Sequence, residues 1–465
     1  MNFLKVFQTI ERPKLVNMGI LFASGLLFWM SMSSLLPTLP AYIEDMGAQP
    51  KQVALVMSFF AIGLLGSRIW LGQLADESLD RFLKNIPLFP PINRLIFVFG
   101  KLIFGSLVYY PSRKVIILIG TTVAAIAPMC YLFFNQIPQL MAIRAFHGIS
   151  IAAFTTGYSA LVVDISPPKQ KGELIGYMSL VIPLGMAVGP AVGGFLQEYS
   201  SYQTLFLFCA GCSILSLSLA SQVREFPPER RKEIKAQEKN SSPNSNSEKE
   251  DFGRSFKELF LDRSFFVPTL VLLLVGSLFS TIVTFLPLHI RELDINFNVG
   301  FFYTGTAIAS FSMRFFAGQA SDMYGRGRFI TLSLLCYVIS MVILVSAQTP
   351  PSLIVAALFE GAGAGMLLPI TIALISDRCT FRERGKVFSL CVGGFDVGVA
   401  VGSAILGSLF LDFGGYTFLF TIAGIMATIA LVIFMTSANK NLLSSLKFAW
   451  GNTPDYHALN IEKPS

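Results

Sequence analysis

Long uninterrupted runs of apolar residues dominate the chain, and short polar segments separate them. A helix needs about 20 apolar residues to cross the hydrocarbon core of a bilayer, and twelve runs come close to or exceed that length. The strict alternation of apolar and polar positions that marks a membrane β-barrel is not the pattern of these runs. The predicted spans are Val16–Leu36, Gln52–Leu71, Val115–Phe134, Gln139–Val163, Leu174–Leu196, Tyr202–Gln222, Phe265–Leu288, Gly300–Gly318, Phe329–Ala347, Ser352–Ser376, Phe388–Leu411 and Tyr416–Thr436. We therefore expect an all-α membrane protein with twelve transmembrane helices.

Composition and charge agree with a multi-pass membrane protein. The 465 residues are 53% hydrophobic and only 14% charged, whereas a soluble domain has about 25% charged residues. Of the 35 Lys and Arg residues, 30 fall in the N-terminus, alternate loops and the tail, and only Lys51 and Arg291 fall in the opposite loops. This bias predicts that both termini are cytoplasmic, in an inner or plasma membrane. The net charge of +7 follows from these loops, so we expect no nucleic-acid partner.

The two halves of the chain repeat one another. Gly72-Gln-Leu-Ala-Asp76 matches Gly318-Gln-Ala-Ser-Asp322, and Gly185 and Gly189 match Gly398 and Gly402. We predict two pseudo-symmetric six-helix bundles. The predicted units are an N-terminal bundle over 1–222, a cytoplasmic linker over 223–263, a C-terminal bundle over 264–436 and a cytoplasmic tail over 437–465.

Two predicted segments stand apart from the spans. The linker is polar and mixed in charge, so it is a flexible tether or, alternatively, a regulatory or lipid-binding segment. The first half carries an insertion at about 77–114, in which the apolar stretch Leu95–Tyr110 is too short to span. We expect this stretch to lie along the membrane interface as an amphipathic element.

Five ionisable residues fall inside predicted spans, where a charge is costly unless it faces a cavity or a partner. They are Arg68, Arg144, Arg314, Glu360 and Asp396. Burial disfavours the charged carboxylate, as proton carriage requires, so Glu360 is the first candidate for proton coupling and Asp396 the second. The alternative for each acid is a static pair with an arginine.

Three local patterns add to this picture. The first is the glycine-and-acid loop after span two, Gly72 to Asp76, with its second copy Gly318-x-x-x-Asp322-x-x-Gly-Arg326. The second is Arg144-x-x-His147 in span four, and the third is Gly185-x-x-x-Gly189-Pro190-x-x-Gly193 in span five. Together they resemble the major facilitator superfamily, and specifically its twelve-span drug/proton antiporter branch.

The resemblance implies roles for these residues. The glycine-and-acid loop is a cytoplasmic latch in that family; a capped turn without a conformational role is the alternative. Independently of the resemblance, Arg68 and Arg314 lie one turn before the latch glycines, near the cytoplasmic interface, so we expect them to snorkel or pair with loop acids and to act as gate residues. In the family, basic residues follow the acid of the glycine-and-acid loop. Here the insertion separates Asp76 from such residues, and Arg113-Lys114 are the candidates for them. Arg144 would contribute to proton coupling or substrate contact. His147 would carry protons or simply pack.

The glycine string of span five is the family's antiporter motif. Its glycines recur every four residues and so share one helix face, and we expect Pro190 to bend the span. Ordinary close packing of helices is the alternative reading of Gly185, Gly189 and Gly193.

We therefore predict a secondary active transporter that exports a small amphipathic or hydrophobic solute in exchange for protons, acting as a monomer. Alternatives are a proton symporter for a sugar or organic acid, a lipid-handling carrier, and a non-transporting sensor or scaffold. The sequence carries no nucleotide-binding loop, nucleophile–base set or metal-ligand spacing, so we expect neither an enzyme nor a bound cofactor.

Overall fold

The computed structural model describes residues 11–76, 112–166, 171–224, 256–379 and 383–459. Helices fill nearly all of these ranges, and no β-strand occurs within them. The helices are α2 (Arg12–Asp45), α3 (Pro50–Asp76), α6 (Arg113–Phe133), α7 (Ile137–Ile165), α8 (Lys171–Ser179), α9 (Val181–Tyr199), α10 (Tyr202–Gln222), α12 (Phe256–Leu261), α13 (Arg263–Glu292), α14 (Val299–Tyr324), α15 (Arg326–Ser346), α16 (Pro350–Arg378), α17 (Arg384–Ser437) and α18 (Leu442–Ala449). The all-α prediction is confirmed.

The helices account for the twelve predicted spans. Ten helical segments of the described chain are long and apolar enough to cross a membrane, α8 and α9 together forming one of them. α14 is long enough but more polar, and α17 contains two spans that meet at Gly414 and Gly415. Gly415 has φ 63° and ψ −155°, a conformation open to glycine and strained for other residues, so the chain turns there.

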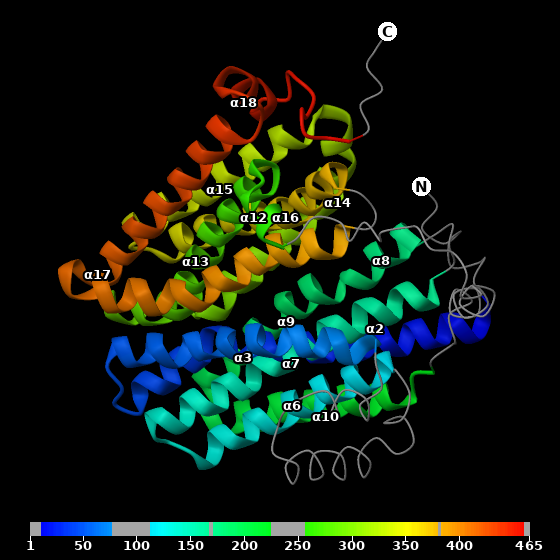
Figure 1. Ribbon diagram of the computed structural model, residues 1–465. Helices are drawn as coiled ribbons and strands as arrows, with labels where there is room; N and C mark the ends of the chain where they lie inside the picture. The colour runs from blue at the N-terminus through cyan, green and yellow to red at the C-terminus, as the bar shows by residue number, and fades with distance from the viewer. Residues whose placement is uncertain (1–10, 77–111, 167–170, 225–255, 380–382, 460–465) are drawn as a thin grey trace.

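The helices form two bundles that repeat one contact pattern (Figure 1). In the first bundle α2 packs on α9, and α7 packs on α3 and α6; in the second, α13 packs on α17, and α16 packs on α14 and α15. Between the bundles, α9 contacts α14, α3 contacts α17 and α2 contacts α13. The equivalence of these contacts is the pseudo-two-fold symmetry that the sequence repeat predicts.

Glycines bring α2 and α9 into close contact. A Cβ atom on Gly185 would lie 2.5 Å from Cβ of Trp29, and one on Gly189 would lie 2.5 Å from the Met30 carbonyl oxygen. Ser33 and Ser34 of α2 donate hydrogen bonds to the carbonyls of these two glycines, at 3.0 and 2.9 Å. The α9 glycines therefore act here as a packing face, and Gly398 and Gly402 make the equivalent contact with α13.

Pro190, where a bend is predicted, lies inside α9, and the same span is also interrupted at Leu180, between α8 and α9. Pro183 follows three residues later. Because proline has no N–H and its ring meets the carbonyl four residues earlier, Pro183 disfavours a helix that continues through Ser179.

The two ends of the molecule differ in how the bundles pack. We call the end where α2 begins and α17 ends the terminal face, and the end with the turns 46–49 and 293–298 the distal face. Near the distal face one apolar cluster joins both bundles, including Leu39 and Val53 with Leu286. Near the terminal face, the first bundle has a separate cluster around Leu21 and Leu161. The apolar packing between bundles is thus continuous at the distal face and divided at the terminal face.

The tail folds back onto the second bundle. α18 packs on α15 and α17, and lies at the outer side of that bundle in Figure 1. Arg378 at the end of α16 donates two hydrogen bonds to Asp455, at 2.7 and 3.0 Å, and two more to backbone carbonyls. The predicted interfacial element at Leu95–Tyr110 and most of the linker lie outside the described residues.

Candidate functional site

Glu360 lies on α16 inside the second bundle. Its side chain is 3% exposed, and its Oε2 has no hydrogen-bond partner among the described residues. Thr306, whose hydroxyl donates to the Ala357 carbonyl at 3.2 Å, lies near the Glu360 carboxyl group, as do Tyr303 and Tyr337. Arg314 of α14 lies near the same Tyr337, and its Nε has no hydrogen-bond partner within the described ranges. Glu360 is therefore a buried acid surrounded by hydroxyl groups.

Arg144 and His147 lie together on α7 inside the first bundle, next to Tyr131. The Arg144 guanidinium lies 4.5 Å from the centroid of the Phe60 ring, a cation–π contact. The Tyr131 hydroxyl is 3.4 Å from Nδ1 of His147, which is completely buried. Arg144 Nε and His147 Nε2 have no hydrogen-bond partner in the described part of the chain. Both residues thus lie within one bundle, with an aromatic ring and a hydroxyl as neighbours.

Arg68 and Asp396 form an ion pair between the bundles. Nη1 of Arg68 on α3 contacts Oδ2 of Asp396 on α17. The Asp396 side chain is 9% exposed, whereas that of Arg68 is 32% exposed. The pair therefore has one buried partner and one that reaches solvent, and it connects two helices of different bundles.

The two copies of the latch differ in what the structure describes. Gly72 and Asp76 lie in the last turns of α3, and their side chains are outside the described part. In the second copy, Gly318 lies on α14, and Arg326 pairs with Asp322 at 3.5 Å and with Asp377 at 2.9 Å.

An arginine after the insertion makes an ion pair equivalent to that of Arg326. Arg113 pairs with Asp164 at 3.6 Å, and both residues lie 213 positions before Arg326 and Asp377. Arg113, which the insertion separates from the first latch copy, therefore makes the same ion pair in the first bundle that Arg326 makes in the second.

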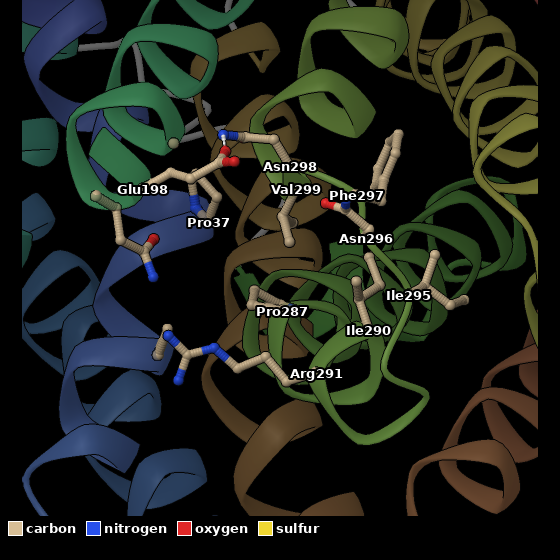
Figure 2. A pocket seen from close by; sticks show the side chains of 13 residues that line it. Pro37, Glu198, Pro287, Ile290, Arg291, Ile295, Asn296, Phe297, Asn298 and Val299 are labelled. Carbon is tan, nitrogen blue, oxygen red and sulfur yellow. Dashed lines mark hydrogen bonds between the residues drawn. The ribbon is translucent and has the colours of Figure 1, made fainter.

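A pocket of about 330 Å³ lies between the bundles near the distal face. Figure 2 shows its lining, in which Glu198 and Pro37 of the first bundle face Arg291 and Asn298 of the second. Neither Glu360 nor Asp396 lines it.

Several polar contacts between the bundles were not predicted from the sequence. Arg291 pairs with Asp45 and Glu44, Lys51 pairs with Asp412, and Asn298 donates to Glu198. The one available signal was that Lys51 and Arg291 are the two basic residues predicted for the distal loops. No group of three or more potential metal ligands occurs in the described ranges.

Two bundles of apolar helices, with ionisable groups inside and between them, define a polytopic membrane transporter. The chain belongs to the Major Facilitator Superfamily, whose family model matches residues 92–322 and 294–446. It is therefore a multi-pass transporter of small molecules and not an enzyme.

Curated relatives are similar over most of the chain. Multidrug resistance protein MdtG of Klebsiella pneumoniae (strain 342) is 23% identical over 454 residues, covering 96% of this chain and 97% of the relative. Quinolone resistance protein NorA of Staphylococcus aureus (strain COL) is also 23% identical, over 399 residues, covering 84% and 89%.

Solved structures share the fold. A bacterial homologue of the human lysosomal transporter Spinster has a TM-score of 0.64 at 13% identity, covering 95% of this chain and 98% of that one. The nucleoside transporter NupG has a TM-score of 0.67 at 12% identity, covering 90% and 99%.

Proposed function

We propose that this transporter exports small amphipathic or hydrophobic organic solutes in exchange for protons, by alternating access between the two bundles. Glu360 carries the proposal. A carboxylate buried without a basic partner is expensive, and binding a proton removes that cost. Glu360 therefore suits a residue that is protonated in one step of the cycle and deprotonated in another. The names of the two curated relatives support export of drug-like solutes.

Asp396 connects proton binding to movement of the bundles. Its charge attracts Arg68 across the contact between α3 and α17. Protonation of Asp396 removes that charge, so the attraction between the two helices weakens. Proton binding at this position thus favours separation of the bundles along α3 and α17.

The orientation and units follow from the sequence repeat and the charge bias. The terminal face is cytoplasmic, and the distal face is on the other side of the membrane. The moving units are the bundles over 1–222 and 264–436, joined by the linker over 223–263, and a single chain forms the working transporter. The latch at Gly318, Asp322 and Arg326 acts at the cytoplasmic side.

Proton flux in reconstituted proteoliposomes tests the proposal. The internal pH is recorded while a panel that includes a quinolone and a lipophilic cation is added. We expect solute-driven proton movement in the opposite direction to the solute, abolished in Glu360→Gln. The matched control is Glu11→Gln, which removes an exposed acid at the terminal face whose side chain is 72% exposed.

The alternatives give different results in the same assay. A symporter for a sugar or organic acid moves solute and proton in the same direction. A non-transporting sensor or scaffold gives no flux with any solute. Unchanged coupling in Glu360→Gln would refute the role of Glu360.

A further inference from the structure

We infer that α18 and the residue after it, Trp450, lie in the membrane interface and bind the headgroups of anionic phospholipids. Two features of the helix support this. The second bundle leaves a wide apolar side of α18 uncovered, and two exposed lysines flank that side. The inference uses only the membrane-spanning fold, and it depends neither on the coupling ion nor on the direction of transport.

α18 is held on the second bundle in one orientation. Its buried side consists of Ser445, Phe448 and Ala449, and it contacts α15 and α17. A Cβ atom on Gly327, at the start of α15, would clash with the Phe448 carbonyl oxygen, so the two backbones touch. The turn from α17 is fixed as well, because the Asn439 backbone N–H donates to Oγ of Ser445 at 2.9 Å. The side that α18 turns outward is therefore set by the fold.

The outward side of α18 is apolar. Leu442, Leu446 and Trp450 follow one another at intervals of four residues, so they form one line along the helix, and Leu443 lies beside that line. Leu442, Leu443 and Trp450 are 58%, 64% and 52% exposed. A helix that only packs on a bundle and faces water needs apolar residues on its buried side alone. This second apolar side therefore requires another cover.

The lipid-facing surface of the second bundle continues into this side. α15 and α17, on which α18 packs, expose Leu332 and Val432 within membrane-spanning segments near the terminal face. α17 ends at Ser437 and α18 begins at Leu442, so the helix starts directly after a span. Figure 1 shows α18 on the side of the second bundle away from the first. The bilayer surface is therefore the cover that lies within reach.

The polar residues around the apolar side match an anionic lipid surface. Lys440 precedes α18 and Lys447 lies in its last turn, and both side chains are exposed. Within the described residues neither lysine pairs with an acid, and Lys440 lies over the Tyr456 ring at 5.0 Å. Tryptophan and lysine beside an apolar surface are typical of the membrane–water interface. Because lysines at a membrane surface are attracted to anionic headgroups, an anionic phospholipid is the partner that fits.

Lipid binding at α18 holds the tail on the second bundle. Asp455 of the tail pairs with the buried Arg378, and the Leu459 N–H donates to the Asp377 carbonyl at 2.9 Å. The Asp377 side chain in turn pairs with Arg326 of the second latch copy. A ligand that binds the docked tail better than the free tail stabilises docking. Anionic lipid therefore strengthens the cover that the tail places over this latch copy.

Quenching of Trp450 fluorescence by brominated lipid tests the contact. Trp29→Phe with Trp70→Phe leaves Trp450 as the single tryptophan, since the chain has three. The protein is reconstituted in vesicles of phosphatidylcholine mixed with phosphatidylglycerol, with bromine on the acyl chains of one lipid or of the other. We expect both lipids to quench Trp450, and we expect stronger quenching when phosphatidylglycerol carries the bromine.

The lysines separate selection by charge from simple contact with lipid. One lysine near an anionic surface favours that surface about fivefold, so Lys447→Gln should lower the preference for phosphatidylglycerol by about that factor. Lys14→Gln removes a lysine at the terminal face of the first bundle and is the matched control, with no expected change. Thermal scans that follow Trp450 test docking. Phosphatidylglycerol should raise the temperature at which the tail undocks, and Lys440→Gln with Lys447→Gln should remove that rise.

Other covers of this side of α18 give different results. If it faces water, aqueous iodide quenches Trp450 and brominated lipid does not. If a second copy or another protein covers it, neither reagent quenches Trp450. Either result would overturn the inference, and so would equal quenching by the two brominated lipids or an undocking temperature that phosphatidylglycerol does not raise. These readouts do not report proton flux, so the lipid contact can stand even if Glu360→Gln leaves proton coupling unchanged.

Discussion

Replacing Asp455 with asparagine should destabilise the second bundle, because it leaves the Arg378 charge buried without its counter-ion. The Arg378 side chain is fully buried, and that of Asp455 is 10% exposed. Removing one partner of a buried ion pair costs about 3–5 kcal/mol. Asparagine keeps one acceptor oxygen, and Arg378 keeps its bonds to the carbonyls of Ser264 and Ala438. We therefore expect a loss of about 2–3 kcal/mol.

Thermal unfolding in detergent measures this loss. For a unit of this size, 2–3 kcal/mol corresponds to a decrease of about 5–10 °C in Tm. The fluorescence of Trp450, which follows α18, reports whether the tail leaves the bundle in the same transition. Circular dichroism of the helices follows the bundle itself.

An exposed ion pair provides the control for Asp455→Asn. Lys14 and Glu11 lie 3.3 Å apart, but the Glu11 side chain is 72% exposed, so Glu11→Gln should cost less than about 1 kcal/mol. If the penalty comes from the buried charge, Arg378→Met combined with Asp455→Leu should recover part of the Tm. Equal Tm values for Asp455→Asn and Glu11→Gln would refute this reasoning.

Two further predictions concern the tail and the helix contacts. Burial, together with the nearby Arg378, holds the pKa of His457 below its usual value. As the pH falls below about 6.5, His457 therefore binds a proton more readily in the undocked tail than in the docked tail, and docking of the tail weakens. Thermal scans between pH 7.5 and 5.5 should show that His457→Gln flattens this dependence; an unchanged slope would exclude His457 as its source. Gly189→Ala should lower the free energy of unfolding by about 1–3 kcal/mol, because the added Cβ would clash with α2. Gly211→Ala is the control: the space around its Cβ is open, so it should be neutral or stabilising by up to about 1 kcal/mol. Similar Tm values for the two alanine variants would contradict the close contact between α2 and α9.

The apolar runs determined the helices and their approximate bounds. Tyr202–Gln222 is α10 to the residue, and most other spans differ only in their ends, which extend past the apolar run. α2 continues to Asp45, for example, because a helix beyond the bilayer core is still stabilised by its backbone hydrogen bonds and by packing. The repeat likewise predicted the two bundles, since equivalent sequences form equivalent contacts.

The candidate acids illustrate the limit of sequence reasoning. Glu360 and Asp396 are the candidates because a charge inside a span needs a reason; the sequence ranks Glu360 first but does not show which of the two acids is paired with an arginine. The structure places Asp396 against Arg68 and Glu360 among hydroxyl groups. That difference depends on how each helix is rotated about its axis.

The sequence by itself determined that this chain is a twelve-span helical membrane protein built from two repeated halves, because hydropathy and repetition are local properties. Only the tertiary structure decided which charges meet. Lys51 and Asp412 lie 361 residues apart in the chain, and Arg291 and Asp45 lie 246 apart. Such pairs arise from the relative placement of two bundles, and no feature of either segment alone specifies that placement.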